Sequence, residues 1–475
     1  MTHELSWSLH VLLWPLRLAL SVAVTLHALR TKRDIGSSIG WIGLAWLAPL
    51  TGCILYIMFG VNRVRRLARR LSLNRPWSSP RNVSTGHHTL GGRYAPLAEA
   101  VQRLTGRPLL RGNRVRCFHD GDTAYPVMLD AIAGARRSIL LSSYLFHDDP
   151  VGAGFVDALI AARARGVQVL VLVDGIGSGY LRCRAVARLR QAGVPAARFM
   201  HSLLPWRMPF INLRTHKKIL VVDGRLGFTG GMNIAEENVL GRNPRHPVSD
   251  THFELAGPVV HQLSEAFAKD WSFSTGEEID EAVFFPEQEA AVQDAGALMR
   301  VITSGPDTDV EKIEFAMMQA ASLAVRSVRI MTPYFLPDER LLTVLAMAAM
   351  RGVEIDVVMP QRSNQRPVDW ARVPNNAPLL DAGVRLWLAR PPFNHSKLMV
   401  IDRSWSLIGS SNLDVRSLRL NFELNVEVYD EALAAELDAF VCGHRHRRVT
   451  HHDQDRRRFP ERLRDSGARL MLPYL

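Results

Sequence analysis

Two stretches of this chain carry one pattern, His216-Lys-Lys-Ile-Leu-Val-Val-Asp223 and His395-Ser-Lys-Leu-Met-Val-Ile-Asp402. Six residues after each aspartate a second shared segment begins, Gly230-Gly-Met-Asn233 in the first copy and Gly409-Ser-Ser-Asn412 in the second. A long pattern that recurs with the same internal spacing indicates two structural units of one kind. We therefore predict two halves that each contribute one copy to a single site.

The residues upstream of each copy repeat as well. The first half has a strand-like run at 138–144, a helical run at 155–165 and a strand-like run at 166–174, and the second half has counterparts at 328–334, 341–351 and 352–359. Continuous apolar strands between helices are typical of a sheet that helices cover on both faces. The predicted fold class is α/β, with two tandem α/β/α repeats related by a pseudo-twofold axis and domains at 93–290 and 291–475.

The histidine and the lysine of each copy are expected to act together. Side chains alternate between the two faces of a strand, so His216 and Lys218 share a face, as do His395 and Lys397. An ammonium group can neutralise a phosphoryl oxygen while an imidazole attacks phosphorus or moves a proton. The residue types therefore suit the handling of a phosphodiester.

The aspartates that close each copy, Asp223 and Asp402, belong to the candidate catalytic set but fall on the opposite face of the strand, at its end. We therefore expect them to support the strand or its turn rather than to touch the reacting phosphorus. The side chains expected to donate hydrogen bonds to the phosphoryl oxygens are Asn233, Ser410 and Asn412.

Two further acids are candidates for orienting the histidine rings. Asp250 and Glu423 follow the histidines of their own halves by 34 and 28 residues (250 − 216 and 423 − 395). A carboxylate beside an imidazole fixes its tautomer, as the third member of a catalytic triad does. The alternative is that both are ordinary exposed acids.

Two histidines are sufficient to exchange a phosphodiester through a covalent intermediate. One ring attacks phosphorus, while the other protonates the departing alkoxide and then deprotonates the acceptor. This scheme requires no metal ion and no cofactor. The four cysteines form no paired-ligand spacing, so the sequence predicts neither a zinc site nor a disulfide framework.

The charge and the N-terminal residues narrow the class of substrate. A net charge of +12 and a pI near 10.0 favour an anionic partner. Apolar segments at 9–29 and 39–60 are long enough for two membrane-spanning helices, although Arg17 interrupts the first. A cleaved signal peptide is the alternative for the first segment. The expected partners are a membrane and an anionic phospholipid, and no nucleic acid is expected.

Basic residues set the expected topology. Three lie at 30–33 and five at 63–70, so the denser cluster after the second segment is expected to keep the catalytic part on the cytoplasmic side. Residues 63–92 are expected to form a basic juxtamembrane segment and a linker. Residues 203–214 mix apolar and basic side chains, which predicts either a lipid-contacting loop or a buried cover. The basic tail at 444–458 is expected to be solvated or to contact anionic lipid.

These motifs resemble the phospholipase D superfamily, whose signature is a paired HKD motif, and they are most similar to the bacterial cardiolipin synthases. Further blocks resemble that family: Pro49–Gly60, Phe228–Ile234, Asp250–His252, Asp270-Trp271, Ser304–Asp307, Thr332–Phe335 and Ser410–Asp414. Gly231 stands where other superfamily members carry serine. The residues after Ile234 depart from the family, since Ala-Glu-Glu-Asn-Val occurs where Gly-Asp-Glu-Tyr is expected. The resemblance covers nearly the whole chain and implies two phospholipase D-like domains.

The resemblance also implies an activity. A cardiolipin synthase of the bacterial inner membrane transfers a phosphatidyl group from one phosphatidylglycerol to another and releases glycerol. By analogy His216 is the nucleophile and His395 is the general acid and then base, although the symmetry of the two halves leaves the reverse assignment open. Phosphatidylethanolamine as second substrate, hydrolysis of phospholipid by water, a nuclease and a non-catalytic scaffold are the alternatives.

Overall fold

The computed structural model describes residues 2–31, 35–60, 90–201, 214–286, 296–306 and 309–470. The basic segment from residue 63, nearly all of the expected linker, the stretch 203–213 and the predicted domain boundary at 290 lie outside the described residues. The chain divides into two compact units, residues 1–73 with 205–211 and residues 74–204 with 212–475. Each unit is described by itself.

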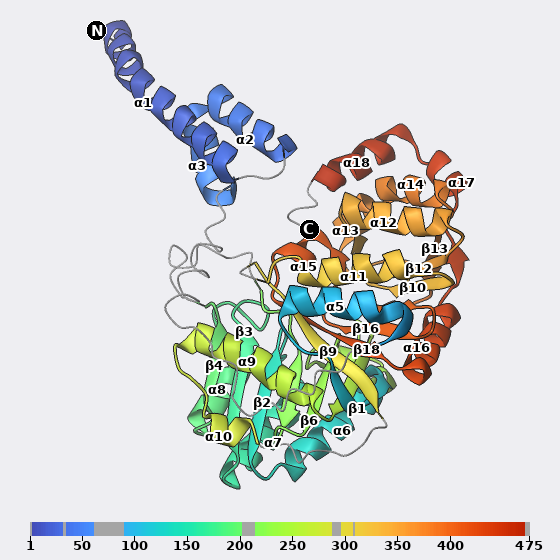
Figure 1. Ribbon diagram of the computed structural model, residues 1–475. Helices are drawn as coiled ribbons and strands as arrows, with labels where there is room; N and C mark the ends of the chain where they lie inside the picture. Colours follow the sequence, from blue (N-terminus) through green and yellow to red (C-terminus); the bar gives the residue numbers. More distant parts are fainter. Residues whose placement is uncertain are drawn as a thin grey trace. The chain divides into compact units, whose positions relative to one another are not determined.

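The two predicted apolar segments are helical in the N-terminal unit, drawn in blue in Figure 1. Helix α1 covers Thr2–Thr31, and the second segment comprises α2 (Ile35–Leu47), α3 (Pro49–Leu55) and a π-helical turn, Tyr56–Gly60. The second segment breaks at Ala48 because the backbone of a residue before proline avoids the helical region. None of the described helices combines the length and the apolar character that crossing a membrane requires. The two predicted spans therefore stay a prediction.

The second unit contains one continuous sheet of 15 strands within the described residues. The strands of its first half are β1 (Leu110–His119), β2 (Ser138–Ser143), β3 (Gln168–Asp174), β4 (Ala196–Phe199), β5 (Ile219–Val222), β6 (Leu226–Gly230) and β8 (Thr251–Ala256). The strands of its second half are β9 (Ala297–Ser304), β10 (Ser327–Met331), β12 (Glu354–Pro360), β13 (Arg385–Ala389), β15 (Leu398–Ile401), β16 (Trp405–Gly409), β18 (Glu423–Tyr429) and β19 (Arg447–Arg448).

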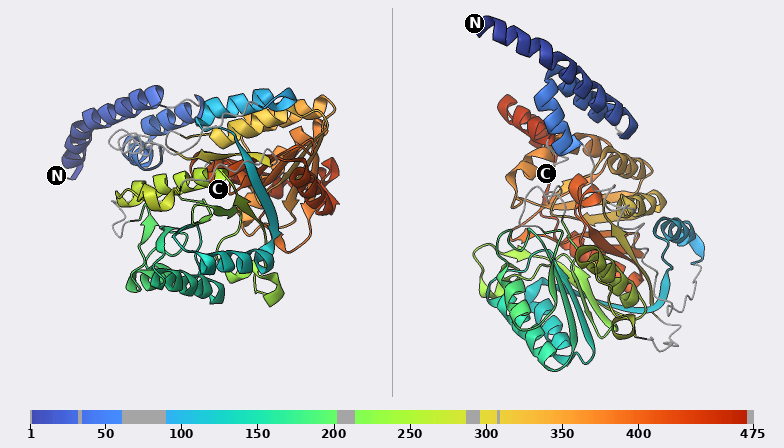
Figure 2. Two further views of the ribbon diagram at one scale, coloured as in Figure 1. Left: turned by 60° about the horizontal axis from the view of Figure 1, so that its bottom comes forward. Right: turned by 90° about the vertical axis from the view of Figure 1, so that its left-hand side faces the viewer.

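The strand order is the same in both halves when each is followed outward from the middle of the sheet. It runs β1-β8-β6-β5-β2-β3-β4 in the first half and β9-β18-β16-β15-β10-β12-β13 in the second, and β19 is added at the end. Strands β1 and β9 pair antiparallel, which joins the two halves into one sheet. Figure 2 shows β1, in teal, running between the halves. The predicted tandem α/β repeat is confirmed, and the palindromic order is the one that a pseudo-twofold axis through the β1–β9 pair produces.

Helices cover both faces of this sheet, as the apolar strands indicated. In β5, Ile219 and Val221 face a core shared by α9 (Val259–Thr275) and α16 (Glu431–Gly443), whereas Leu220 and Val222 face the opposite core. That opposite face is covered in the first half by α6 (Asp120–Gly134), α7 (Pro150–Ala164) and α8 (Arg184–Gln191). In the second half it is covered by α5 (Ala95–Thr105), α11 (Lys312–Leu323), α12 (Glu339–Met350) and α14 (Asn376–Asp381) (Figure 1).

Shorter elements complete the second unit. They are α10 (Glu281–Phe284), α13 (Arg366–Ala371), α15 (Val415–Arg419), α17 (His451–Asp455), α18 (Phe459–Leu470), β7 (Val248–Ser249), β11 (Phe335–Leu336), β14 (Phe393–Asn394) and β17 (Leu413–Asp414). Strand β7 of the first half pairs with β14 of the second, directly before the second histidine. The polypeptide is thus knitted across the two halves where the duplicated motifs begin.

Candidate active site

The two duplicated histidines meet in one place. The ring centroids of His216 and His395 are 6.4 Å apart, and both side chains are buried. Backbone hydrogen bonds between the halves bring them there: the His216 amide donates to the Phe422 carbonyl at 2.8 Å, and the His395 amide donates to the Ser249 carbonyl at 2.7 Å. Each histidine segment is therefore held by the residue that precedes a candidate orienting acid of the other half.

The two orienting acids are paired with the histidines across the halves. Nδ1 of His216 lies 3.1 Å from Oε2 of Glu423, and Nδ1 of His395 lies 2.9 Å from Oδ2 of Asp250. Both carboxylates are fully buried, so the alternative of ordinary exposed acids is wrong. The sequence spacing was measured within each half, but each acid lies against the histidine of the opposite half.

One difference between the copies has a steric cause. A Cβ atom on Gly231 would lie 2.1 Å from Oδ1 of Asp250, so the first copy has room only for glycine. The second copy carries Ser410 at this position, and its hydroxyl donates to Glu423 at 2.5 Å. Asn421 donates to the other oxygen of Glu423 at 3.3 Å. Ser410 was expected to contact phosphate, and in the structure it instead supports the acid that faces His216.

The two lysines lie where the strand alternation predicted. The ammonium of Lys218 donates to the His216 carbonyl at 2.7 Å, and that of Lys397 donates to the His395 carbonyl. Nζ of Lys397 also lies 2.6 Å from Nδ1 of His395 and 3.7 Å from Oδ2 of Asp250. Both lysines are buried, so each ammonium is held in the site by its own histidine's backbone.

Burial and like charge shift the protonation equilibria of the site. Desolvation lowers the pKa of Lys218 to about 7, with a further lowering from Lys397, and desolvation lowers the pKa of Lys397 to about 8 against the raising effect of Asp250. Burial lowers the pKa of His216 below its usual value, and burial together with the two lysines lowers that of His395 well below it. Both rings are consequently neutral near pH 7 when no substrate is bound.

The aspartates that close the motifs lie away from the rings, as the parity argument predicted. The carboxylate of Asp223 accepts hydrogen bonds from the amides of residues 136, 137 and 138 at 3.0, 2.7 and 2.9 Å. The carboxylate of Asp402 accepts from residues 325, 326 and 327 at 3.0, 2.7 and 2.6 Å and pairs with Arg93 at 2.8 Å. Each aspartate therefore fixes the start of β2 or β10 beside its own motif strand.

A cavity of about 310 Å³ opens over the histidine pair. Its lining includes both rings and the two candidate asparagines, Asn233 and Asn412. Oδ1 of Asn233 accepts from the Leu145 amide at 3.4 Å, which turns its amide nitrogen towards other partners. Oδ1 of Asn412 is buried and has no hydrogen-bond partner among the described residues. Both side chains thus keep a polar end for a ligand in the cavity.

Two tyrosines of the cavity wall were not among the predicted site residues. The ring of Tyr144 contacts His216 at a centroid distance of 4.9 Å, and the ring of Tyr334 lies 6.3 Å from His395. The tyrosines follow the equivalent strands β2 and β10. The signal that could have found them is the repeat itself, since each closes the first strand-like run of its half.

The lysine that has no counterpart in the second copy has a separate role. Lys217 is buried and forms an ion pair at 2.9 Å with Asp270 of α9. Ser396 occupies the equivalent position of the second copy. Lys217 therefore ties the first motif to the helix beneath the sheet and does not join the histidine pair.

Comparisons with known proteins agree with this architecture. The family model "Cardiolipin synthase, PLD-like domain" matches residues 128–271 and 316–441, and the model "Phospholipase_D-nuclease N-terminal" matches residues 19–60. Cardiolipin synthase A of Pseudomonas aeruginosa is 34% identical over 96% of this chain and 94% of its own length. Cardiolipin synthase 1 of Bacillus cereus is 29% identical over 94% of this chain and 90% of its own length.

A solved structure shares the fold. The phosphatidylserine synthase of Haemophilus influenzae aligns with a TM-score of 0.60 at 14% identity, over 80% of this chain and all of that one. At this identity the match supports the fold alone. The family model covers both halves of the sheet, and the Pseudomonas relative extends over nearly the full length. This chain therefore belongs to the family of cardiolipin synthases with a phospholipase D-like domain.

Proposed function

We propose that this protein is a phosphatidyltransferase that makes cardiolipin, moving a phosphatidyl group from one phosphatidylglycerol to a second and releasing glycerol. The crossed pairs His216–Glu423 and His395–Asp250, which face one cavity, carry this proposal. Each carboxylate engages Nδ1, so Nε2 of each ring is the nitrogen available for phosphorus or for a proton. Two such rings about 6.4 Å apart bracket a single phosphodiester.

In the first step the neutral His216 attacks phosphorus while His395 gives a proton to the departing glycerol oxygen. A phosphorus–nitrogen bond forms and the phosphorus–oxygen bond to glycerol breaks. In the second step His395 removes the proton from a hydroxyl of the second phosphatidylglycerol, whose oxygen displaces His216 from phosphorus. The site then returns to its starting protonation state.

The lysines and asparagines stabilise the charge that builds on the phosphoryl oxygens. Lys218 and Lys397 are already gathered at the histidines, and Asn233 and Asn412 line the same cavity. An anionic phosphodiester favours the charged lysines and a protonated His395, so substrate binding is accompanied by proton uptake. Water can replace the acceptor hydroxyl, so slow hydrolysis to phosphatidic acid accompanies transfer.

We further propose that the N-terminal helices attach the protein to the bacterial inner membrane through the segments 9–29 and 39–60, with the catalytic part on the cytoplasmic side. Large apolar side chains on α1–α3 are exposed within their own unit, among them Ile35, Ile39 and Leu47 at 75, 66 and 88% of their surface. A soluble unit rarely exposes so much apolar surface, which supports lipid contact.

The test incubates the full-length protein in mixed micelles with isotope-labelled phosphatidylglycerol and identifies the products by mass spectrometry. Cardiolipin and glycerol are expected in equal amounts, and His216→Asn and His395→Asn should each abolish both. His451→Asn, which changes an exposed histidine of α17, is the matched control and should keep full activity. Phosphatidic acid as the sole lipid product would contradict the synthase proposal and leave a phospholipase. A separate assay with phosphatidylethanolamine added as a second lipid determines whether ethanolamine is released.

A further inference from the structure

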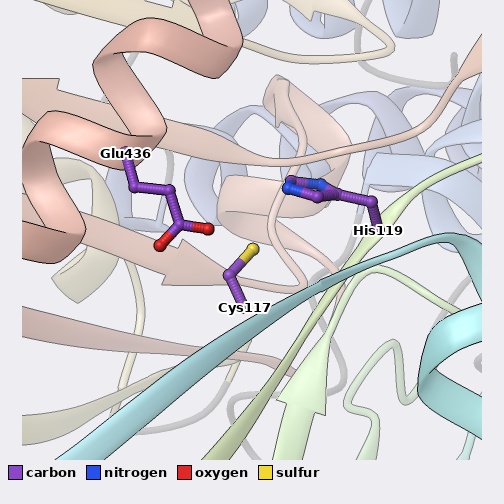
Figure 3. A group of neighbouring side chains, drawn as sticks. All are labelled: Cys117, His119 and Glu436. Carbon is purple, nitrogen blue, oxygen red and sulfur yellow. The ribbon is translucent and has the colours of Figure 1, made fainter.

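A second group of reactive side chains lies outside the histidine pair, where β1 of the first half meets α16 of the second. Cys117 and His119 are two residues apart on β1, so the strand alternation places them on one face. Glu436 reaches them from α16. The thiol sulfur, an imidazole nitrogen and a carboxylate oxygen all lie within 4.8 Å of one another. Figure 3 shows the three side chains pointing towards one another.

The partners of these groups within the protein are few. Nδ1 of His119 is buried and has no hydrogen-bond partner among the described residues. The Cys117 thiol forms no disulfide, and its contact with the Phe118 carbonyl is 3.9 Å long. The ring of His119 stacks on Phe440 at a centroid distance of 4.3 Å and an interplanar angle of 11°. That stacking fixes the ring plane one helical turn beyond Glu436. A buried imidazole nitrogen without a partner, oriented by its surroundings, points to a ligand.

We propose that Cys117, His119 and Glu436 bind a zinc ion that staples β1 of the first half to α16 of the second. A thiolate, an imidazole and a carboxylate form a donor set that zinc takes in proteins, and water would supply the fourth position. The negative charges of the thiolate and the carboxylate balance the two positive charges of the ion, so no net charge is buried at the interface.

The geometry requires only a small adjustment. Tetrahedral zinc–ligand bonds place the donor atoms about 3.3–3.6 Å from one another. The longest separation in the group must therefore shorten by about 1 Å, and the exposed Glu436 side chain is free to rotate by this amount. Burial raises the pKa of the Cys117 thiol, so zinc must displace a proton to solvent when the sulfur–zinc bond forms. Zinc affinity therefore increases with pH.

The zinc ion would be structural and would take no part in phosphoryl transfer. His119 is followed by Asp120, whose amide donates to the Asp250 carbonyl at 2.9 Å and whose Oδ1 accepts from the Asp250 amide at 3.0 Å. The staple therefore fixes the end of β1 that holds the backbone of the acid facing His395. Because the β1–β9 pair is irregular between Leu110 and Asn113, a cross-link at the other end of β1 would strengthen the junction of the halves.

The experiment uses full-length protein in detergent, stripped of metal with a chelator and then titrated with Zn²⁺ or Co²⁺. One zinc ion per chain is expected in competition with a chromophoric chelator. Cobalt should give a thiolate-to-metal charge-transfer band in the near ultraviolet. Cys117→Ser should abolish the band and weaken zinc binding by at least about tenfold, and Glu436→Gln should weaken zinc binding while keeping the band. Zinc should also raise the thermal unfolding midpoint of the wild type but not that of Cys117→Ser.

Two control variants keep the test specific. Cys442→Ser changes another partly buried thiol of α16 and should leave the band and the zinc affinity unchanged. His451→Asn/His452→Asn removes two exposed histidines of the basic tail and should do the same. Metal-free Cys117→Ser must unfold at the midpoint of the metal-free wild type, which separates loss of the ligand from loss of folding. A charge-transfer band that survives in Cys117→Ser, or the absence of any band in the wild type, would overturn the proposal.

Discussion

The sharpest consequence of the crossed site concerns Asp250→Asn, which keeps the shape of the side chain and removes its charge. The carboxylate lies 2.9 Å from Nδ1 of His395 and is fully buried, so water cannot replace it. When His395 carries a proton, the attraction between the two charges is about 4 kcal/mol at 4 Å and an effective dielectric constant of 20. A charge-assisted hydrogen bond of this kind contributes about 1.5–3 kcal/mol. These are two views of one interaction, and a loss of about 3–4 kcal/mol corresponds to a fall in kcat of about 10²–10³-fold.

A substrate with a good leaving group separates the two steps. Phosphatidyl p-nitrophenol releases nitrophenolate without needing a proton, so the first step no longer requires His395 as an acid. In Asp250→Asn we expect a nitrophenolate burst close to that of the wild type, followed by turnover that is about 10²–10³-fold slower. The phosphatidyl group should accumulate on the peptide that contains His216. In Glu423→Gln the burst itself should be slowed, because the carboxylate lost there faces the nucleophile.

The result that would refute this reasoning is specific. If Glu423→Gln keeps the burst and Asp250→Asn loses it, with the adduct still on His216, the acids act on the histidines of their own halves and the crossed geometry is wrong. If the same exchange occurs with the adduct on His395, the geometry stands and the roles of the two histidines are reversed. Rapid quenching followed by peptide mass spectrometry distinguishes the two results.

The remaining predictions concern support, pH and sterics. Asp402→Asn should leave kcat within a few-fold of the wild type but destabilise the fold by about 1.5–3 kcal/mol, seen as a lower unfolding midpoint, because its carboxylate binds backbone amides and not the rings. The value of kcat/KM should fall as the pH rises above about 8, since the pKa values of Lys218 and Lys397 are about 7 and about 8 and the neutral lysines no longer attract a phosphodiester; a flat profile to pH 9 would contradict this. Gly231→Ser should inactivate the enzyme while the reciprocal Ser410→Gly lowers kcat only about tenfold, because a Cβ at 231 would lie 2.1 Å from Asp250 whereas the loss at 410 is one hydrogen bond to Glu423; equal rates would contradict the steric account. Asn412→Ala should raise KM or lower kcat by about 10–100-fold through the loss of one hydrogen bond to the bound lipid, and unchanged kinetics would remove Asn412 from the site.

The sequence was sufficient to predict features that depend on local periodicity. The strand–helix–strand runs at 138–174 and 328–359 correspond to β2-α7-β3 and β10-α12-β12, with boundaries shifted by a few residues. Alternation along a strand separated the lysines from the aspartates of each motif correctly, because both properties follow from the geometry of a single strand. The site histidines came from the repeat alone.

Other features could not be predicted because they depend on contacts between the halves. The spacing of 34 residues from His216 to Asp250 describes one half, whereas Asp250 reaches His395 because β7 pairs with β14. Ser410 was assigned to phosphate because its hydroxyl type is suitable, and only the position of Glu423 shows that the hydroxyl is already used. Cys117 was set aside since no second cysteine lies near it in the sequence. Its neighbours in space are a histidine on the same strand and a glutamate from the other half.

The two copies are alike in chemistry but not in surroundings, and this difference bears on the roles of the histidines. Near His216, Glu423 is held by Ser410 and Asn421, while near His395 the acid shares its surroundings with Lys397. The pKa of His395 is lowered well below its usual value by burial and by the two lysines, so in the free enzyme His395 is the ring less able to hold a proton. A general acid must hold one. The assignment of His395 as the acid therefore requires that the phosphodiester, by pairing with Lys218 and Lys397, removes their repulsion and leaves Asp250 to stabilise the imidazolium. Substrate binding and protonation of His395 are then one coupled event, which makes proton uptake on binding a non-hydrolysable phosphatidylglycerol analogue a direct test of the assignment.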